Sequence, residues 1–138
     1  IDPEDVRKKL SPYTKAIIDA LDRDDVPIIY YVNGGSAMLK KMKTAGSDVI
    51  GVDWRIGLDE AREQLGEDVA VQGNLDPVAL FSSPERVKQR VKEIIDKNAG
   101  RPGHIFNLGQ GVLPATPVEH VKLLVETVHE HSKKKRRR

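Results

Sequence analysis

The residues best suited to bind a ligand lie where short apolar runs end in polar, glycine-rich turns. The last of these runs ends in Gly109-Gln110-Gly111, with one polar side chain between two glycines. Glycine lets a backbone approach another group closely, and no turn type requires glutamine at such a position. A strand that breaks into such a turn is typical of α/β proteins, which bind ligands beyond the carboxyl ends of parallel strands. We therefore expect Gln110 to contact a ligand.

The other three turns carry the same kinds of side chain, chiefly amides and glycines with few acids. They supply the remaining candidate substrate-binding residues: Asn33, Gly34, Asp53, Gln72 and Asn74. Amides and backbone N–H groups suit hydrogen bonding to carboxylates or to pyrrole-like donors. They do not suit a metal ion, because no cluster of histidine, aspartate and glutamate has ligand spacing. The histidines, at positions 104, 120, 129 and 131, are expected to be surface or packing residues.

Several of these residues also have a simpler structural explanation. Asp53 can cap the following helix or bond its own loop, and Asn74 and Asp76 are good turn formers before Pro77. Gln72 can satisfy neighbouring strand ends, and Trp54 is expected to pack rather than stack. Gln110 alone has no such explanation.

The segments between the turns alternate between strand and helix patterns. Helices are expected at 2–22, 37–45, 58–65, 84–95 and 118–131, and strands at 26–32, 48–54, 69–72 and around Phe106. The run at 26–32 is continuously apolar, which predicts a strand buried on both faces. Ile105, Phe106 and Leu108 are expected to be buried in the last strand.

This α(βα)4 order predicts a parallel sheet with right-handed crossovers. Four units are too few to close a (β/α)8 barrel, so an open four-stranded sheet and half of a barrel both fit. The short helices after the first two strands favour the half-barrel. A phosphate-binding cradle is disfavoured, because the first strand is followed by neither G-x-G-x-x-G nor a P-loop lysine.

The chain length of 138 residues fits a single domain, which we place at 1–132, followed by a basic tail at 133–138. The chain has no cysteine, no apolar run long enough to span a membrane, and no signal peptide at its start. The net charge of +2 includes six basic residues in the tail, and without them 17 basic residues face 21 acidic ones. The body therefore lacks the basic surface of a nucleic-acid-binding protein, and the tail is interpreted as a solvated extension.

Three motifs in order resemble the uroporphyrinogen decarboxylase family. They are Val52-Asp53-Trp54, the hexapeptide Gln72-Gly73-Asn74-Leu75-Asp76-Pro77, and Phe106-Asn107-Leu108-Gly109-x-Gly111 followed by Pro114, Glu119-His120-Val121 and Val128-His129. The resemblance spans nearly all of 1–132 and implies the C-terminal half of a (β/α)8 barrel. It implies removal of the four acetate carboxyl groups of uroporphyrinogen III to give coproporphyrinogen III in the haem pathway. It also implies a cytoplasmic enzyme, or a plastid one in a photosynthetic eukaryote, that works as a homodimer without metal or organic cofactor.

Two departures from the family pattern bear on activity. The arginine-bearing loop, the central aspartate, and the tyrosine and serine of the family site have no counterpart in this sequence. The substrate-contacting histidine of the family aligns with Gln110, which keeps hydrogen-bonding capacity but cannot titrate. We therefore identify no catalytic residue in this half and expect it not to decarboxylate alone.

Besides one half of an enzyme, three other functions can be weighed against the sequence. A half-barrel that exposes two sheet edges and an apolar inner face can pair with another chain or with itself. The related corrinoid-dependent methyltransferases share the barrel but hold zinc through histidine and cysteine, and this chain has no cysteine. Nucleic-acid binding rests on the tail alone.

Overall fold

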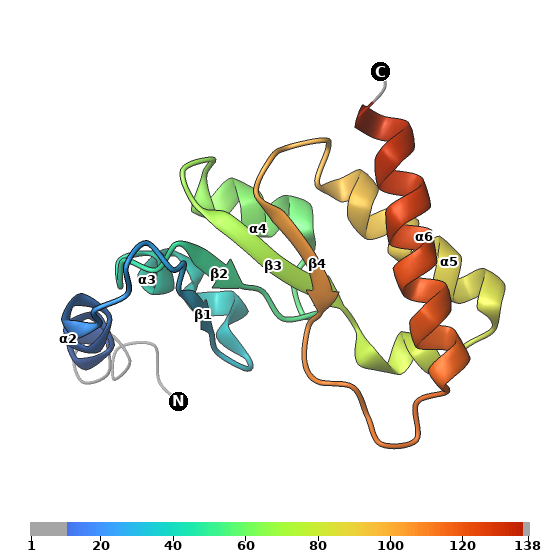
Figure 1. The fold of residues 1–138 in the computed structure, drawn as a ribbon, viewed down its shortest axis with the longest axis horizontal. Helices are drawn as coiled ribbons and strands as arrows, with labels where there is room; N and C mark the ends of the chain where they lie inside the picture. The colour runs from blue at the N-terminus through green and yellow to red at the C-terminus, as the bar shows by residue number, and fades with distance from the viewer. Residues whose placement is uncertain (1–10, 137–138) are drawn as a thin grey trace.

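The computed structural model describes residues 11–136, with side chains described through residue 133. Helices and strands alternate along the chain (Figure 1). In order they are α2 (Ser11–Ala20), β1 (Ile29–Tyr31), η2 (Gly35–Met38), α3 (Leu39–Lys43), β2 (Val49–Gly51), α4 (Leu58–Leu65), β3 (Ala70–Leu75), η3 (Pro77–Phe81), α5 (Pro84–Lys97), β4 (His104–Leu108) and α6 (Val118–Arg136), where η denotes a 3-10 helix. The predicted strand–helix order is confirmed, while the first part of the helix expected at 2–22 lies outside the described residues.

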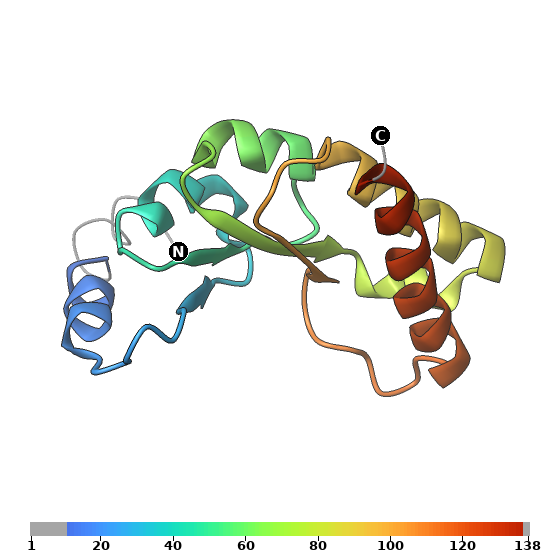
Figure 2. The same cartoon turned by 45° about the horizontal axis from the view of Figure 1, so that its top comes forward.

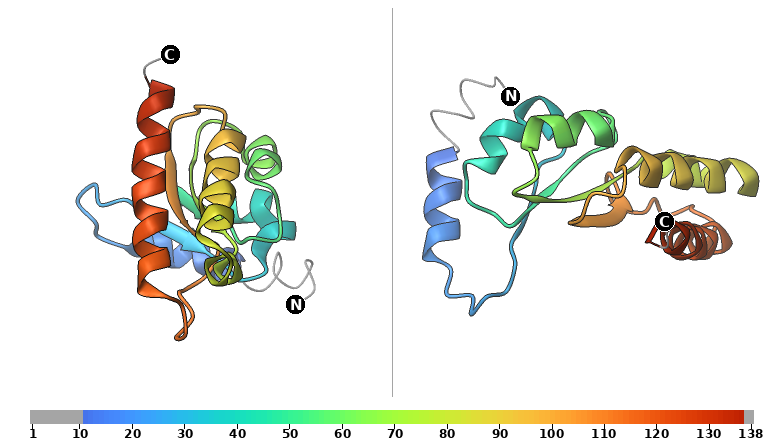
Figure 3. Two further views of the ribbon diagram at one scale, coloured as in Figure 1. Left: turned by 90° about the vertical axis from the view of Figure 1, so that its right-hand side faces the viewer. Right: turned by 90° about the horizontal axis from the view of Figure 1, so that it is seen from above.

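The four strands form one parallel sheet in the order β1-β2-β3-β4. Each strand lies beside the next strand in the sequence, as right-handed crossovers with helices on one side require. Figure 2 shows the sheet curving, with α3, α4 and α5 along its convex side. In Figure 3, α6 lies along α5 at one end of the sheet, while α2 lies at the other end. This arrangement is half of an α/β barrel.

The core lies between the sheet and the helices on its convex side. Helix α5 begins at a strong start signal, because the Ser83 side chain accepts a hydrogen bond from the Arg86 amide and Pro84 occupies the first helical position. Its apolar residues recur at helical spacing and are buried, and the helix packs against β3, η3 and α6. The largest fully enclosed apolar side chains of this core are Leu39, Ile50, Val52, Leu58, Leu65, Val71, Leu75, Leu80, Val87 and Val91.

At the amino edge of the sheet, a buried arginine joins the segments that precede β3 and β4. Arg62 of α4 is 2% exposed. Its guanidinium donates to the Asn98 side chain and to the backbone carbonyls of Val69, Pro102 and Gly103 at 2.9–3.3 Å. These acceptors compensate for burial of the charge, although burial still lowers the pKa of Arg62. The segments before β3 and before β4 are thus held by one side chain.

Two burial predictions are wrong, and both concern the outer strands of the sheet. The run at 26–32 yields only the three residues of β1, in which Ile29 is 46% and Tyr31 39% exposed. In β4, Phe106 and Leu108 are half-buried but Ile105 is 44% exposed. Both strands pair on one side only, so their side chains lack the neighbours that cover β2 and β3.

Element boundaries differ from the prediction where pairing decides them. Strand β2 ends at Gly51 rather than at Trp54, and β3 continues through Leu75 because Gly73, Asn74 and Leu75 pair with β4. Helix α6 runs past His131 to Arg136, so the basic run begins within this helix. Helix α2 buries Ile18, while Ile17 and the following Leu21 are exposed.

The burial of His104 predicts that the protein loses stability on mild acidification. Burial lowers the pKa of His104 below its ordinary value of 6.5, and the nearby Arg62 charge adds to this despite a bond to the Gly73 carbonyl. The unfolded chain therefore binds more protons at this residue below pH 6.5, and the free energy of unfolding falls as the pH drops through that range. Urea unfolding at pH 7.5 and 5.5 measures the loss, which His104→Gln should reduce.

The exposed His129 provides the matched control for this test. His129→Gln should keep the wild-type loss of stability between the two pH values. An equal loss in wild type and His104→Gln would contradict the assignment.

Candidate functional site

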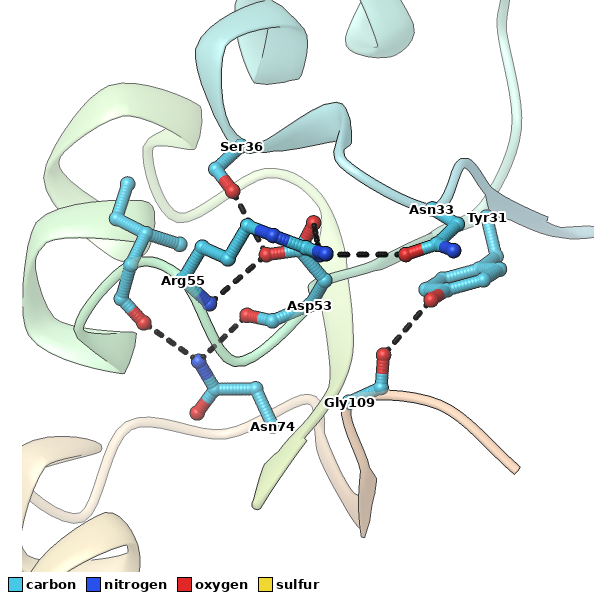
Figure 4. Close-up of polar contacts among 8 residues, drawn as sticks. Tyr31, Asn33, Ser36, Asp53, Arg55, Asn74 and Gly109 are labelled. Carbon is cyan, nitrogen blue, oxygen red and sulfur yellow. Dashed lines mark hydrogen bonds and ion pairs between the residues drawn. The ribbon is translucent and has the colours of Figure 1, made fainter. Parts of the chain in front are cut away.

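Four turns lie at the carboxyl edge of the sheet, and side-chain hydrogen bonds join the turn after β2 to the turn after β1 and to β3, and the turn after β4 to β1 (Figure 4). They span 32–34 after β1, 52–57 after β2, 76–83 after β3 and 109–117 after β4. Parallel strands end on the same edge, so the topology alone brings the predicted residues to one side of the molecule. Their side chains nevertheless divide into those that hold the turns and those that face outward.

Asp53 is the buried centre of this network, with a side chain that is 0% exposed. One carboxylate oxygen accepts from the Ser36 hydroxyl at 2.7 Å and from the Arg55 amide at 2.9 Å. The other accepts from the Arg55 guanidinium at 3.2 Å. The bond to an amide two residues on is the loop-bonding role expected for Asp53, which does not cap α4. All of these contacts serve the turns, so none of them leaves Asp53 facing a ligand.

Arg55 joins the turn after β2 to the turn after β1. Its guanidinium donates to the Asn33 side-chain oxygen at 3.2 Å and lies 4.1 Å above the centre of the Trp54 ring. Trp54 is therefore the platform for a cation–π contact rather than only a packing residue. Neither this stacking nor the reach of Arg55 to Asn33 was predicted from the sequence.

Asn74 and Asp76 have structural roles, as their positions before Pro77 suggested. The Asn74 amide is 5% exposed and donates to the backbone carbonyls of Asp53 at 3.0 Å and Ile56 at 2.7 Å. Asp76 caps η3 by accepting from the Val78 amide at 2.9 Å. Asn74 of β3 thus holds the backbone of the turn after β2 in place.

The turn after β4 reaches across the sheet to β1 and β2. The Gly109 amide donates to the Leu75 carbonyl at 2.7 Å, and the Gly109 carbonyl accepts from the Tyr31 hydroxyl at 2.7 Å. A β-carbon on Gly109 would lie 2.5 Å from the Trp54 amide nitrogen, so only glycine permits this approach. Both backbone groups of Gly109 are held, and the next residue, Gln110, is exposed.

Gln110 and Gln72 line the same cavity of about 470 Å3, bounded by the turn after β4, the edge of the sheet and α6. Register places Gln72 in one row with Tyr31, Gly51 and Ile105. Asn33 and Gly34, in the turn after β1, lie outside this lining, and Gly34 adopts a left-handed conformation with open space where a β-carbon would point. Of the predicted ligand-binding residues, Gln110 and Gln72 face this cavity, while Asp53 and Asn74 are committed to holding the turns.

In the described part of the chain, no three residues of histidine, aspartate, glutamate or cysteine gather as metal ligands. Between Ser11 and Arg136, no helix is both long and apolar enough to cross a membrane.

Comparison with known proteins identifies the family of the chain. Residues 1–131 match the family described as uroporphyrinogen decarboxylase (URO-D). The chain is 52% identical over 132 residues to the uroporphyrinogen decarboxylase of Geotalea uraniireducens strain Rf4, and 51% identical over 132 residues to that of Carboxydothermus hydrogenoformans strain Z-2901. These alignments cover 96% of this chain. The chain belongs to the uroporphyrinogen decarboxylase family.

The chain covers only part of its uroporphyrinogen decarboxylase relatives, spanning 39% of the Geotalea protein and 38% of the Carboxydothermus one. A solved methyltransferase from Methanosarcina mazei has the same fold over 94% of this chain, with a TM-score of 0.81, and the match covers 38% of that protein. At 22% identity this likeness concerns the fold alone. The resemblance read from the three sequence motifs is confirmed at the level of the family.

The two glycines beside Gln110 provide a matched pair of substitutions. Gly109→Ala should lower the free energy of unfolding by about 2–3 kcal/mol, because the added methyl group meets the Trp54 backbone and not a flexible side chain. Gly111 has open space at its β-carbon, so Gly111→Ala should change stability by less than about 0.5 kcal/mol. Chemical denaturation of both variants measures the difference, and equal stabilities would show that the turn does not pack on Trp54.

Tyr31→Phe should loosen the turn that presents Gln110. The hydroxyl donates to Gly109, and burial, together with the Asp53 charge, raises the Tyr31 pKa and keeps this donor protonated. Its loss should speed amide exchange in residues 109–112 roughly fivefold, as expected for one hydrogen bond.

Tyr30→Phe is the control for this experiment. Tyr30 packs against the core from the other side of β1. Its hydroxyl has no role in the turn, so the exchange rates of residues 109–112 should stay at their wild-type values. Unchanged rates in Tyr31→Phe would contradict the assignment.

Proposed function

We propose that this chain forms the C-terminal half of a uroporphyrinogen decarboxylase barrel. Joined to the half that its longer relatives also contain, it removes the four acetate carboxyl groups of uroporphyrinogen III to give coproporphyrinogen III. The proposal rests on sequence similarity: along nearly its whole length, the chain is 52% and 51% identical to two uroporphyrinogen decarboxylases. The enzyme class is accordingly a carboxy-lyase.

This half supplies a neutral wall for a carboxylated macrocycle. Gln110 stands exposed on a turn whose backbone is held on both sides, so its amide can donate and accept hydrogen bonds at a fixed place. Gln72 faces the same cavity. We assign Asn33 and Gly34 to the part of the substrate wall that the turn after β1 supplies. The reaction also needs a proton donor to the pyrrole carbon and several charged groups for the carboxylates, and we assign the proton donor and most of these charged groups to the other half. No metal or organic cofactor takes part.

The partner is the complementary half-barrel, which covers the open face of the sheet. Tyr31 and Ile105 lie in the same row of that face and are both substantially exposed, and β1 and β4 each have an unpaired edge. A further set of parallel strands could pair with the free edge of β1 at one end and with the free edge of β4 at the other, and so close a barrel. We place the assembled enzyme in the cytoplasm, as a homodimer.

A test of this function is reconstitution of the barrel from two chains. The 138-residue chain alone should form no coproporphyrinogen from uroporphyrinogen III. Mixed with the separately produced N-terminal half of the Geotalea relative, it should co-sediment and decarboxylate. Gln110→Ala should lower the rate of the mixture roughly tenfold or more, because a positioned hydrogen bond is lost. Gln110→His, which restores the family's residue, should raise it.

Two outcomes would contradict the proposal. Coproporphyrinogen formation by the isolated chain would place the chemistry in this half. Co-sedimentation without turnover by either the wild type or Gln110→His would favour a second function, a non-catalytic half-barrel that pairs through its exposed sheet face.

A further inference from the structure

The four turns at the carboxyl edge contain one basic residue, Arg55. Every other side chain in them is neutral or acidic. The proposed substrate carries a carboxylate on each of its side chains, so a fixed cation at this edge is significant for recognition. We propose that Arg55 is a specificity-determining residue that binds one carboxylate of the tetrapyrrole. This inference rests on the proposed function.

The guanidinium of Arg55 is held in place by three different contacts. One of its terminal nitrogens donates to both Asp53 and Asn33, each at 3.2 Å, and the Trp54 ring lies under the guanidinium plane. These contacts come from two separate turns, so they fix both the position and the tilt of the group. A guanidinium held in this way loses little conformational freedom when it binds an anion.

The opposite edge of the guanidinium takes no part in these contacts. The three contacts use one terminal nitrogen and one face of the plane, and the side chain remains 49% exposed. The second terminal nitrogen and Nε point along a common edge, which is the two-donor geometry that matches a carboxylate. Arg55 therefore retains the part of the group that makes a bidentate contact.

Asp53 does not cancel the attraction of Arg55 for an anion. Its carboxylate is fully buried and already accepts from Ser36, from the Arg55 amide and from the Arg55 guanidinium. Its charge is thus spread over donors on its own side of the guanidinium, away from the exposed edge. The pair orients the cation and leaves its open edge for the ligand.

Binding of uroporphyrin to the 138-residue chain tests the inference. Uroporphyrin is the oxidised, fluorescent form of the proposed substrate and keeps all of its carboxylates. Its anisotropy reports affinity, and quenching of Trp54, the chain's one tryptophan, reports binding beside Arg55. Arg55→Gln should weaken binding about tenfold, as loss of a charge-assisted bidentate contact predicts.

Two further variants separate recognition from folding and from net charge. Arg55→Lys keeps the positive charge beside Asp53 but not the two-donor edge, so it should weaken binding roughly threefold while the fold is preserved. Arg101→Gln removes the same charge at the opposite edge of the sheet, just before β4, and should bind like wild type.

The outcomes distinguish this inference from the proposed function. If Arg55→Gln and Arg55→Lys bind uroporphyrin as tightly as Arg101→Gln, the role of Arg55 is overturned and the tetrapyrrole substrate stands. If the wild-type chain neither binds uroporphyrin nor shows quenching of Trp54, the role of Arg55 is overturned, and the reconstitution assay decides the proposed function separately.

Discussion

The carboxyl edge of this half-barrel depends on one close approach between two backbones. Gly109 lies against the peptide that joins Asp53 to Trp54, at a distance that no β-carbon permits. This approach brings the turn after β4 over the end of β3, where it meets the turn after β2 and the Tyr31 hydroxyl from β1. Without it, Gln110 would have no fixed place relative to the other turns. Gly109 therefore sets the geometry of the cavity wall, because its close approach fixes the backbone that positions the surrounding side chains.

Much of this arrangement could be predicted from local sequence, because it follows from local physics. Ser83-Pro84 at the start of α5, Gly66 at the end of α4 and the apolar spacing of both helices specify elements without reference to the rest of the chain. The turns at the carboxyl edge could be located for the same reason, since Gln110 between two glycines is unusual wherever it occurs. The hexapeptide beginning at Gln72 identified the family, and the relatives confirm that identification.

The errors concern properties that depend on distant neighbours. The run containing Ile29 and Tyr31 has the composition of a buried strand, but burial requires another strand on each side, and β1 has one only on one side. The same holds for Ile105 in β4. The roles of Tyr31, Arg55 and Arg62 were missed because each reaches a residue at least twenty positions away, or one in another turn, and no spacing rule describes such contacts. Asn74 and Asp53 were correctly placed at the edge, but both are buried and their polar groups bond to other groups of the chain.

The position of the core has a consequence for how a whole barrel can be assembled. The enclosed apolar residues lie between the sheet and helices that are adjacent in sequence, not in the space enclosed by the curved sheet. Contacts of this kind join residues at short separation along the chain, and such contacts form early and rapidly in folding. Each pair of units can therefore acquire its own interior before the two ends of the sheet meet. Closure of the ring then becomes a docking of preformed surfaces, which is the property that allows a barrel to be divided and rejoined.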